Sequence, residues 1–270
     1  MNAALSTLTA HQRKVMSGVL AHESAQRRHV VISLSGAHAY GFPSPDSDLD
    51  LKCVHLAPTE SLLGFPRVPS PAERLEVIDG VEIDYSSNEL GGVLLGVLKG
   101  NGNYLERFLS GYAISTGPGF DQLVPIVQRA LSRRVGRHYW GFGTQQREEW
   151  NKGGQKSAKK LLYVLRTTLT GTHLLLTGEM VTDVTKLFSR YGLDEALELV
   201  EQKKRGEKSD LPEALSLKWA TRVESLFERL KEAEANSVLP LEPQNENELE
   251  DALISLRTLP LPAQAGRGLG

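Results

Sequence analysis

The sequence predicts an α+β protein, with a small mixed β-sheet and flanking helices in its N-terminal half and helices in its C-terminal half. Short β-branched or alternating segments bounded by glycine, proline or Asp-Gly lie before residue 118. After Ser115-Thr116-Gly117-Pro118-Gly119 the glycine and proline content changes and apolar residues recur at helical spacing. We therefore expect an α/β domain at 1–118, an α-helical domain at 119–258 and a disordered tail at 259–270.

Local signals place the elements of the N-terminal half. The first is an amphipathic helix at 7–28, with Thr7 or Thr9 as its cap. Strands are predicted at 30–35, which is β-branched and ends at Gly36, and at 49–56, which alternates. The remaining elements are a loop at 40–47, a proline-rich surface connection at 57–73, a hairpin at 74–86 that turns at Asp79-Gly80, and helices at 89–99 and 104–109.

Helical periodicity dominates the C-terminal half. Apolar residues spaced by three or four positions alternate there with charged ones, which is typical of helices that bury one face. Helices are expected at 120–133, 154–176, 193–205, 211–235 and 245–257.

Composition sets limits on the class of protein. The 270 residues carry a formal net charge of −2, so binding to nucleic acid would need a local basic patch. Cys53 is the single cysteine, which excludes an intramolecular disulfide and suits a reducing cytoplasm. The seven histidines show no metal-ligand spacing. No secretory signal is expected at the N-terminus, and no apolar run reaches the ~18 residues of a membrane span, so we expect a cytoplasmic protein.

Two aspartates at the start of the second strand indicate a metal site. Asp48 and Asp50 are at i and i+2 of an extended segment, so their carboxylates project from one face, roughly 7 Å apart along the chain. Like charges so placed raise each other's pKa unless a positive charge lies between them. Mg²⁺ prefers carboxylate oxygen and keeps positions for water and phosphate, so the pattern favours metal-assisted transfer of a nucleotidyl group. The alternative is a solvated strand face.

Several motifs carry a family resemblance over roughly residues 30–260. They are Gly-Ala-His-Ala-Tyr-Gly-Phe-Pro-Ser-Pro-Asp-Ser-Asp-Leu-Asp at 36–50, Asp84, Lys-Gly-Asn-Gly-Asn-Tyr-Leu-Glu at 99–106, Lys-Lys-Leu-Leu-Tyr-Val-Leu-Arg at 159–166 and Leu-Leu-Thr-Gly-Glu at 175–179. Together they resemble the nucleotidyltransferases related to DNA polymerase β, and within them the RNA-ligase-associated (RNA repair) branch.

The resemblance implies a small twisted sheet flanked by helices, and an enzyme that transfers NMP from a nucleoside triphosphate to a hydroxyl, often an RNA end, with release of pyrophosphate. Asp48, Asp50 and Asp84 would bind Mg²⁺ (or Mn²⁺), and Asp84 would also help to activate the acceptor hydroxyl. Gly36 would let backbone amides approach the triphosphate. Glu82 is the rival to Asp84, because both lie on one face of the hairpin's second strand.

One position departs from the family pattern. The family usually has Gly-Ser where this chain has Gly36-Ala37, and the serine hydroxyl contacts the triphosphate. Ala37 lacks that donor but keeps the turn and its amides, and Ser35 or His38 are the neighbouring candidates to replace it. Ser47, beside Asp48, is a further candidate for nucleotide binding, although Asp and Ser at such positions also form turns.

A basic stripe is predicted on the helix at 154–176 and the residues before it. Lys152, Lys156, Lys159, Tyr163 and Arg166 follow i, i+4, i+7, i+11 and i+14. The resemblance places this helix across the cleft from the acidic site, where Lys159, Tyr163 and Arg166 would bind the nucleotide. The alternatives are a solvated face of lysines and, for Tyr163, packing in the core. The charged run at 201–205 is expected to be a solvated helix end.

Three functions therefore remain open. The first is metal-dependent transfer of NMP to a hydroxyl acceptor, with an RNA end preferred because the resembling family is associated with RNA repair. The second is transfer to a protein side chain or small molecule, as in toxin–antitoxin or antibiotic-modifying relatives. The third is a non-catalytic module that binds nucleotide or RNA. No membrane partner is expected, and the sequence does not fix an oligomeric state.

Overall fold

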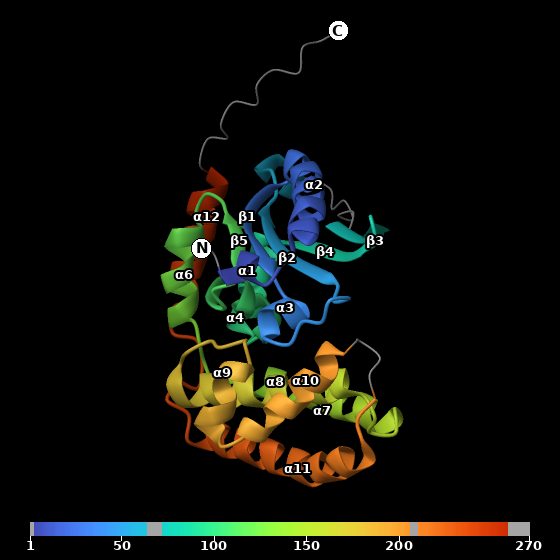
Figure 1. Ribbon diagram of the computed structural model, residues 1–270. Helices are drawn as coiled ribbons and strands as arrows, with labels where there is room; N and C mark the ends of the chain where they lie inside the picture. Colours follow the sequence, from blue (N-terminus) through green and yellow to red (C-terminus); the bar gives the residue numbers. More distant parts are fainter. Residues whose placement is uncertain (1–2, 64–71, 206–209, 259–270) are drawn as a thin grey trace.

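A mixed β-sheet with its own helices forms the upper part of the molecule, and a layer of helices lies beneath it (Figure 1). The computed structural model describes residues 3–63, 72–205 and 210–258. Within these residues the sheet has five strands in the order β3-β4-β2-β1-β5. The strands are β1 (Arg28–Leu34), β2 (Leu49–Leu56), β3 (Ala72–Ile78), β4 (Val81–Glu89) and β5 (Ala113–Thr116).

Strand pairing is antiparallel everywhere except between β2 and β4. These two central strands run parallel, with Asp50 paired to Asp84 and Lys52 to Ser86. β3 and β4 form the predicted hairpin, in which Asp79 and Gly80 both have positive φ, as a tight two-residue turn requires. Because paired residues present their side chains on the same face, the register fixes which polar groups of β2 and β4 meet.

Helices cover both faces of the sheet and fill the lower layer. α2 packs on β1 and β4, whereas α4 and α5 pack on the other side, and α6 and α12 lie outside them (Figure 1). The helices of the upper part are α1 (Ala3–Ser6), α2 (Ala10–Gln26), α3 (Gly36–Tyr40), α4 (Leu90–Leu98), α5 (Gly102–Leu109), α6 (Phe120–Arg129) and α12 (Glu246–Thr258), with a 3₁₀ turn at Thr59–Leu62. The lower layer contains α7 (Arg134–Lys152), α8 (Ala158–Thr177), α9 (Thr185–Phe188), α10 (Leu197–Lys204) and α11 (Glu213–Ala235), with 3₁₀ turns at Ser189–Tyr191 and Asp194–Ala196.

The hydrophobic core is continuous between the two layers. One cluster joins the α2 side of the sheet to α8, α10 and α11, and a second joins α4, α5 and α6 to α7, α11 and α12. Each cluster therefore contains residues from both sides of position 118. The division into domains at 118 remains a prediction, but the two halves share their apolar contacts.

The predicted α+β class is confirmed, and most predicted elements are present. The strand predicted at 49–56 has the bounds of β2, and Thr9 caps α2 through a reciprocal hydrogen-bond pair with Gln12. The segment at 36–40, expected as a turn, is the short helix α3. The predicted tail at 259–270 and residues 64–71 of the predicted connection lie outside the described residues. Among the residues described, no helix is both long enough and apolar enough to span a bilayer.

Of the elements that the sequence did not predict, which also include α1 and α9, two have identifiable reasons. β5 has four residues and pairs only with β1 at the sheet edge, so it carries too little pattern to detect. α7 contains Gly136, Gly141 and Gly143, which lower helix propensity. Packing supplies the missing stability, because α7 makes its most extensive contacts with α8 and small residues let the two helices approach closely.

A paired substitution tests this packing. A Cβ at Gly171 of α8 would lie 2.6 Å from Tyr139 Cβ of α7, whereas a Cβ at Gly141 would meet nothing within 4 Å. We expect Gly171→Ala to lower the free energy of unfolding by roughly 1–3 kcal/mol. Gly141→Ala should raise it by about 0.5–1 kcal/mol, because it improves helix propensity at an exposed site. Urea unfolding measures both, and equal effects would contradict this account.

Candidate functional site

A polar cavity of about 260 Å³ lies where the sheet meets α5 and the start of the lower layer. Its walls come from separate elements: the central strands, the glycine turn at α3, one face of α5, and α8. The polar, charged and aromatic residues of the wall, with the glycine of the turn, include Ser33, Ser35, Gly36, Tyr40, Asp50, Lys52, Ser86, Asn103, Glu106, Arg107 and Tyr163. Such a mixture of carboxylate, cations and hydroxyls suits a charged, oxygen-rich ligand.

The three predicted aspartates lie on or beside two adjacent strands, with Asp48 just before β2, Asp50 near the start of β2 and Asp84 in the middle of β4. Asp50 and Asp84 are directly paired in the parallel register of β2 and β4, so both side chains lie on the face that also carries Lys52. Asp48 stands one residue before β2 and not within it, which corrects the expectation that the strand carries it. Asp50 lines the cavity, whereas Asp48 and Asp84 do not; the Asp84 side chain is 41% exposed and contacts Lys52, which does line it.

Lys52 is the cation closest to this acidic group. Its Nζ lies 2.7 Å from Oδ1 of Asp84, and it also lines the cavity. The register predicts this contact, because Lys52 is two residues from Asp50 on the same face of β2. Sequence analysis did not single it out, although the i, i+2, i+4 spacing of Asp48, Asp50 and Lys52 was a usable signal.

The glycine turn closes directly over Asp50. Gly36 has φ of +61°, and a Cβ at this position would lie 1.7 Å from Oδ2 of Asp50, so only glycine fits. The Ser35 N–H donates to the carbonyl of Asp50 at 2.9 Å, which fixes the turn on the strand. Backbone of the turn and an acidic side chain are thereby brought to one wall of the cavity.

Burial and like charges make Asp50 a weaker acid than usual. Burial, and then the negative charge of Asp48, raise the pKa of Asp50 from 3.8 to about 7, with Asp84 adding to the effect. The charges of Lys52 and Lys159 oppose it. The site therefore has more negative charge than its own cations neutralise.

The donor set fits a hard divalent cation such as Mg²⁺ or Mn²⁺. Asp48, Asp50 and Asp84 offer only carboxylate oxygens, and a bound cation would stabilise the charged form of Asp50, whose pKa is raised first by burial and then by the charge of Asp48. As placed, no three acidic, histidine or cysteine side chains of the described residues are gathered closely enough to hold an ion. Asp84 is held by Lys52, so it would have to exchange that ion pair for a metal.

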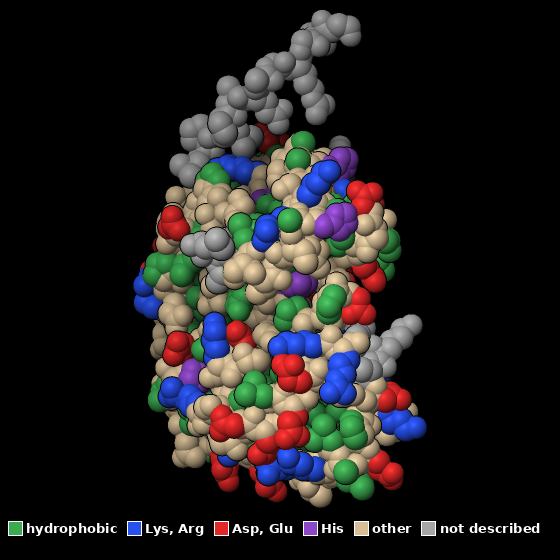
Figure 2. All heavy atoms as spheres, viewed as in Figure 1, with side chains coloured by type: hydrophobic (Ala, Val, Ile, Leu, Met, Phe, Trp, Pro, Cys, Tyr) green, Lys and Arg blue, Asp and Glu red, His purple; other side chains and the backbone are tan. Residues whose placement is uncertain are grey.

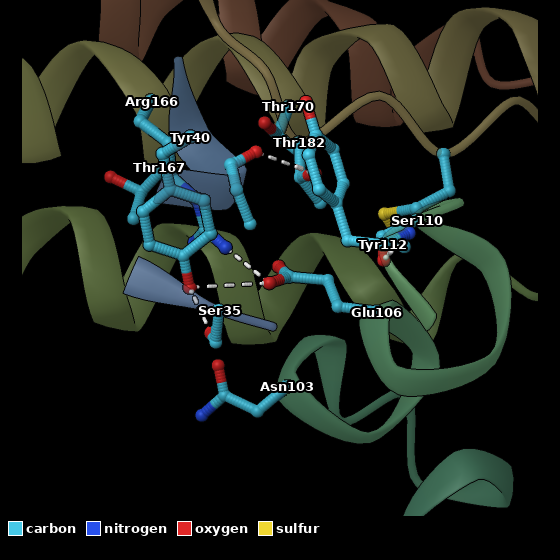
Figure 3. A network of polar contacts seen from close by, with 12 residues as sticks. Ser35, Tyr40, Asn103, Glu106, Ser110, Tyr112, Arg166, Thr167, Thr170 and Thr182 are labelled. Atoms are coloured by element: carbon cyan, nitrogen blue, oxygen red, sulfur yellow. Dashed lines mark hydrogen bonds and ion pairs between the residues drawn. The ribbon is translucent and has the colours of Figure 1, made fainter. Parts of the chain in front are cut away.

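A buried polar network lies behind the cavity (Figure 3). Glu106 of α5 forms an ion pair with Arg166 of α8, whose side chain is fully buried. Tyr139 of α7 and Tyr40 of α3 each donate to this carboxylate, at 3.1 and 3.4 Å. The Arg166 guanidinium carbon lies 3.8 Å from the ring centroid of Tyr40, and the Tyr40 hydroxyl contacts Ser35 at 3.0 Å. Four helices are thus joined to the glycine turn.

The predicted basic stripe is only partly formed. Lys152 ends α7, and α8 begins at Ala158, so Lys152 and Lys156 do not share the helix of Arg166. Arg166 itself does not line the cavity and is paired with Glu106, so the expectation that it contacts phosphate does not suit its position. No pattern in the sequence identifies Glu106 and Tyr40 as partners of Arg166, because they lie 60 and 126 residues away from it.

Other predicted residues reach the cavity or its surroundings. Tyr163 lines the cavity and packs edge-to-face on Tyr40 and Phe42, so the alternative of core packing is met, and its role in nucleotide binding stays a prediction. Lys159 lies near enough to Asp50 to lower its pKa. Ala37 is buried in the core and is not part of the cavity wall, whereas Ser35 is.

The loop before Asp48 is anchored from the helical layer. Ser47 is buried, and its Oγ accepts from the Ser44 N–H at 2.9 Å. Lys203 of α10 donates to Ser44 Oγ at 2.5 Å and to Ser47 Oγ at 3.2 Å, and it is fully buried. The expectation that residues 201–205 form a solvated helix end is therefore wrong for Lys203. Sequence analysis also missed Arg107, which lines the cavity and donates to the Asn88 side chain at 2.8 Å.

Removing one partner of the buried ion pair should be far more damaging than removing a surface pair. Arg166→Met leaves Glu106 charged and buried, so we expect the free energy of unfolding to fall by roughly 3–5 kcal/mol. Arg129→Met breaks the exposed pair with Glu248 and should change it by less than about 1 kcal/mol. Urea unfolding measures the free energy of unfolding of both variants. Similar losses would show that the buried pair stabilises the fold no more than the exposed pair does.

Stability should also depend on the proton of Asp50. The folded protein holds this proton more tightly than the unfolded chain, so its stability falls as the pH rises from about 4 to about 7. Asp50→Asn removes the buried charge and should stabilise the metal-free protein above pH 7, by at most roughly 4 kcal/mol. Thermal unfolding in EDTA across this range tests it. The gain should shrink toward zero at pH 4, and a gain independent of pH would contradict the assignment.

Comparison with known proteins identifies the family. The chain matches the model of the RNA repair pathway DNA polymerase beta family over residues 12–255. It is also 29% identical over 156 residues to an uncharacterized protein of Methanocaldococcus jannaschii, a match that covers 57% of this chain and 63% of that relative. The resemblance found in the sequence is therefore confirmed, and the family match includes every strand and all the aspartates of the cavity region. This protein belongs to the RNA repair pathway DNA polymerase beta family.

Proposed function

We propose that this protein is a metal-dependent nucleotidyltransferase that moves NMP from a nucleoside triphosphate to the hydroxyl of an RNA end and releases pyrophosphate. Family membership supports the reaction type and the association with RNA repair. The single observation that carries the proposal is the pairing of Asp50 with Asp84 on parallel strands, with Asp48 beside them, at a cavity closed by the Gly36 turn.

The cavity offers groups of the right kind for a triphosphate. The turn at Gly36 supplies backbone, and Ser35 supplies a hydroxyl on the cavity wall where Ala37 has none. Lys52 and Arg107 line the wall and carry charges opposite to those of phosphate. Tyr163 lines the same space, and Lys159 lies close enough to Asp50 to lower its pKa. Ser47 acts indirectly in this scheme, by holding the loop that leads to Asp48.

The transfer needs positioning and charge neutralisation more than covalent chemistry from the protein. The acceptor hydroxyl oxygen forms a bond to the α-phosphorus as the bond from that phosphorus to the β-bridging oxygen breaks, and pyrophosphate leaves. Asp84, which contacts Lys52 of the cavity wall, takes the proton of the hydroxyl. Lys52, its present partner, is then free to face the phosphate oxygens. Asp48 and Asp50 would hold Mg²⁺ or Mn²⁺, which neutralises the phosphate oxygens and polarises the phosphorus.

Transfer activity gives a direct test. The protein is incubated with labelled ATP, CTP, GTP or UTP, Mg²⁺ and RNA bearing a free 3′ hydroxyl. We expect extended RNA and pyrophosphate, and a loss of at least about 1,000-fold in rate for Asp48→Asn, Asp50→Asn and Asp84→Asn. Glu82→Gln is the matched control, because Glu82 lies on the same face of β4 but is exposed outside the cavity. EDTA should abolish activity.

Three results would contradict the proposal. Label found on proteins or small molecules in place of RNA would favour the second class of acceptor. Triphosphate binding that is indifferent to Mg²⁺, with no transfer, would favour a non-catalytic module. Activity that survives Asp50→Asn would exclude the aspartates as the reacting centre.

A further inference from the structure

A second hollow lies on the other side of the N-terminus of α5. It is open to solvent, has a volume of about 610 Å³, and is lined by Lys99, Gly100, Asn101, Arg134, Arg137 and His138. Lys99, Arg134 and Arg137 are exposed, and no acidic side chain belongs to the lining. The proposed transfer does not use any of these residues, so the cluster needs its own explanation.

The positive charge of this hollow is largely uncompensated. Arg134 pairs with Glu242 and donates to the Leu98 carbonyl at 2.9 Å. Within the described part of the chain, neither Lys99 nor Arg137 has an ion pair. On the face of the molecule in Figure 2, by comparison, acidic and basic side chains are interspersed. The whole chain carries a net charge of −2 and so does not attract an anionic polymer by its overall charge. Binding of such a polymer would need a local group of cations like this one.

Backbone packing makes the hollow a fixed feature. Gly100 has φ of +74°, and a Cβ there would lie 2.5 Å from the Arg134 carbonyl carbon, so the turn before α5 rests on the first turn of α7. Both helices begin at the hollow, since Asn101 caps α5 and Arg134 is the first residue of α7. The positive ends of the two helix dipoles add to the potential of the side chains. Burial, and then the charge of Arg166, lower the pKa of His138 to about 4, so His138 adds no charge near neutral pH.

The hollow and the cavity share the start of α5. Asn101 lines the hollow and Asn103 lines the cavity. These residues are two positions apart, so their Cα atoms are at most ~7 Å from each other. An anionic chain held in the hollow is therefore close to the place where the transfer would occur.

We propose that Lys99, Arg134 and Arg137 bind the phosphate backbone of the RNA acceptor strand and so present its terminal hydroxyl to the cavity. This inference rests on the proposed function for the identity of the acceptor, and adds the surface that binds it. The proposed contacts are between these cations and backbone phosphates and involve no bases, so the surface should bind RNA with little sequence preference.

RNA binding without triphosphate tests the surface separately from catalysis. Fluorescence anisotropy is measured with a single-stranded RNA about 20 nucleotides long, at several salt concentrations between roughly 50 and 200 mM. The test variant is Lys99→Glu/Arg137→Glu. The control is Lys218→Glu/Lys231→Glu, which makes the same charge change on exposed positions of α11, at the far side of the helical layer (Figure 1).

We expect the test variant to bind RNA at least about tenfold more weakly than the wild type. The slope of its log affinity against log salt should be shallower by roughly 1.4, because two phosphate contacts with a single strand are lost. The control should match the wild type in both. Lys99→Gln/Arg137→Gln removes the two charges without reversing them and should lose RNA affinity to an intermediate degree. Its thermal unfolding should match that of the wild type, which would exclude misfolding as the cause of the loss.

Two outcomes would overturn the inference. One is RNA affinity in the test variant equal to that of the control. The other is an equal loss of Mg²⁺-ATP affinity in the test variant, which would show that the hollow holds the triphosphate and not the strand. If the surface binds RNA as expected but no variant or wild-type protein transfers nucleotide, the proposed function fails and the RNA-binding surface stands.

Discussion

The buried ion pair between Glu106 and Arg166 is the interaction on which the arrangement of the site depends. It joins α5, which lies against the sheet, to α8, the central helix of the lower layer. Tyr139 and Tyr40 donate hydrogen bonds to the carboxylate, and the Tyr40 ring lies under the guanidinium. Nε and Nη1 of Arg166 are buried and have no hydrogen-bond partner among the described residues, so the ion pair and the ring contact are what hold this cation. Tyr40 belongs to α3, so the pair also fixes the segment that begins with Gly36. The orientation of the two layers and the position of the glycine turn are therefore coupled through this pair.

The acidic group opposes folding, which is typical of a site that binds charged ligands. Asp50 is half-buried beside Asp48 and Asp84, whose charges raise its pKa while those of Lys52 and Lys159 lower it. A purely structural sheet would be more stable with neutral residues at these positions. The same excess of negative charge is what makes the group attractive to a divalent cation and lets a ligand stabilise the fold on binding.

Both halves of the chain contribute to the cavity and its support. β2 and β4 carry the aspartates, while Tyr163 of α8 completes the wall and Lys203 of α10 holds the loop before Asp48. Changes in how the helical layer packs on the sheet would thus move residues of the cavity. The basic hollow follows the same pattern, because Lys99 precedes α5 whereas Arg134 and Arg137 belong to α7.

Local patterns were enough to predict the α+β class, the strand at 49–56, the hairpin at Asp79-Gly80 and the three candidate aspartates, because periodicity, turn chemistry and motif spacing can all be read along the chain. Tertiary structure decided what each charge does. Arg166, predicted as a phosphate ligand, is neutralised by Glu106, and Lys203, predicted as solvated, is buried against Ser44 and Ser47. A helical pattern shows which residues share a face but not which distant residue that face meets, and the partner determines whether a cation binds substrate or holds the fold.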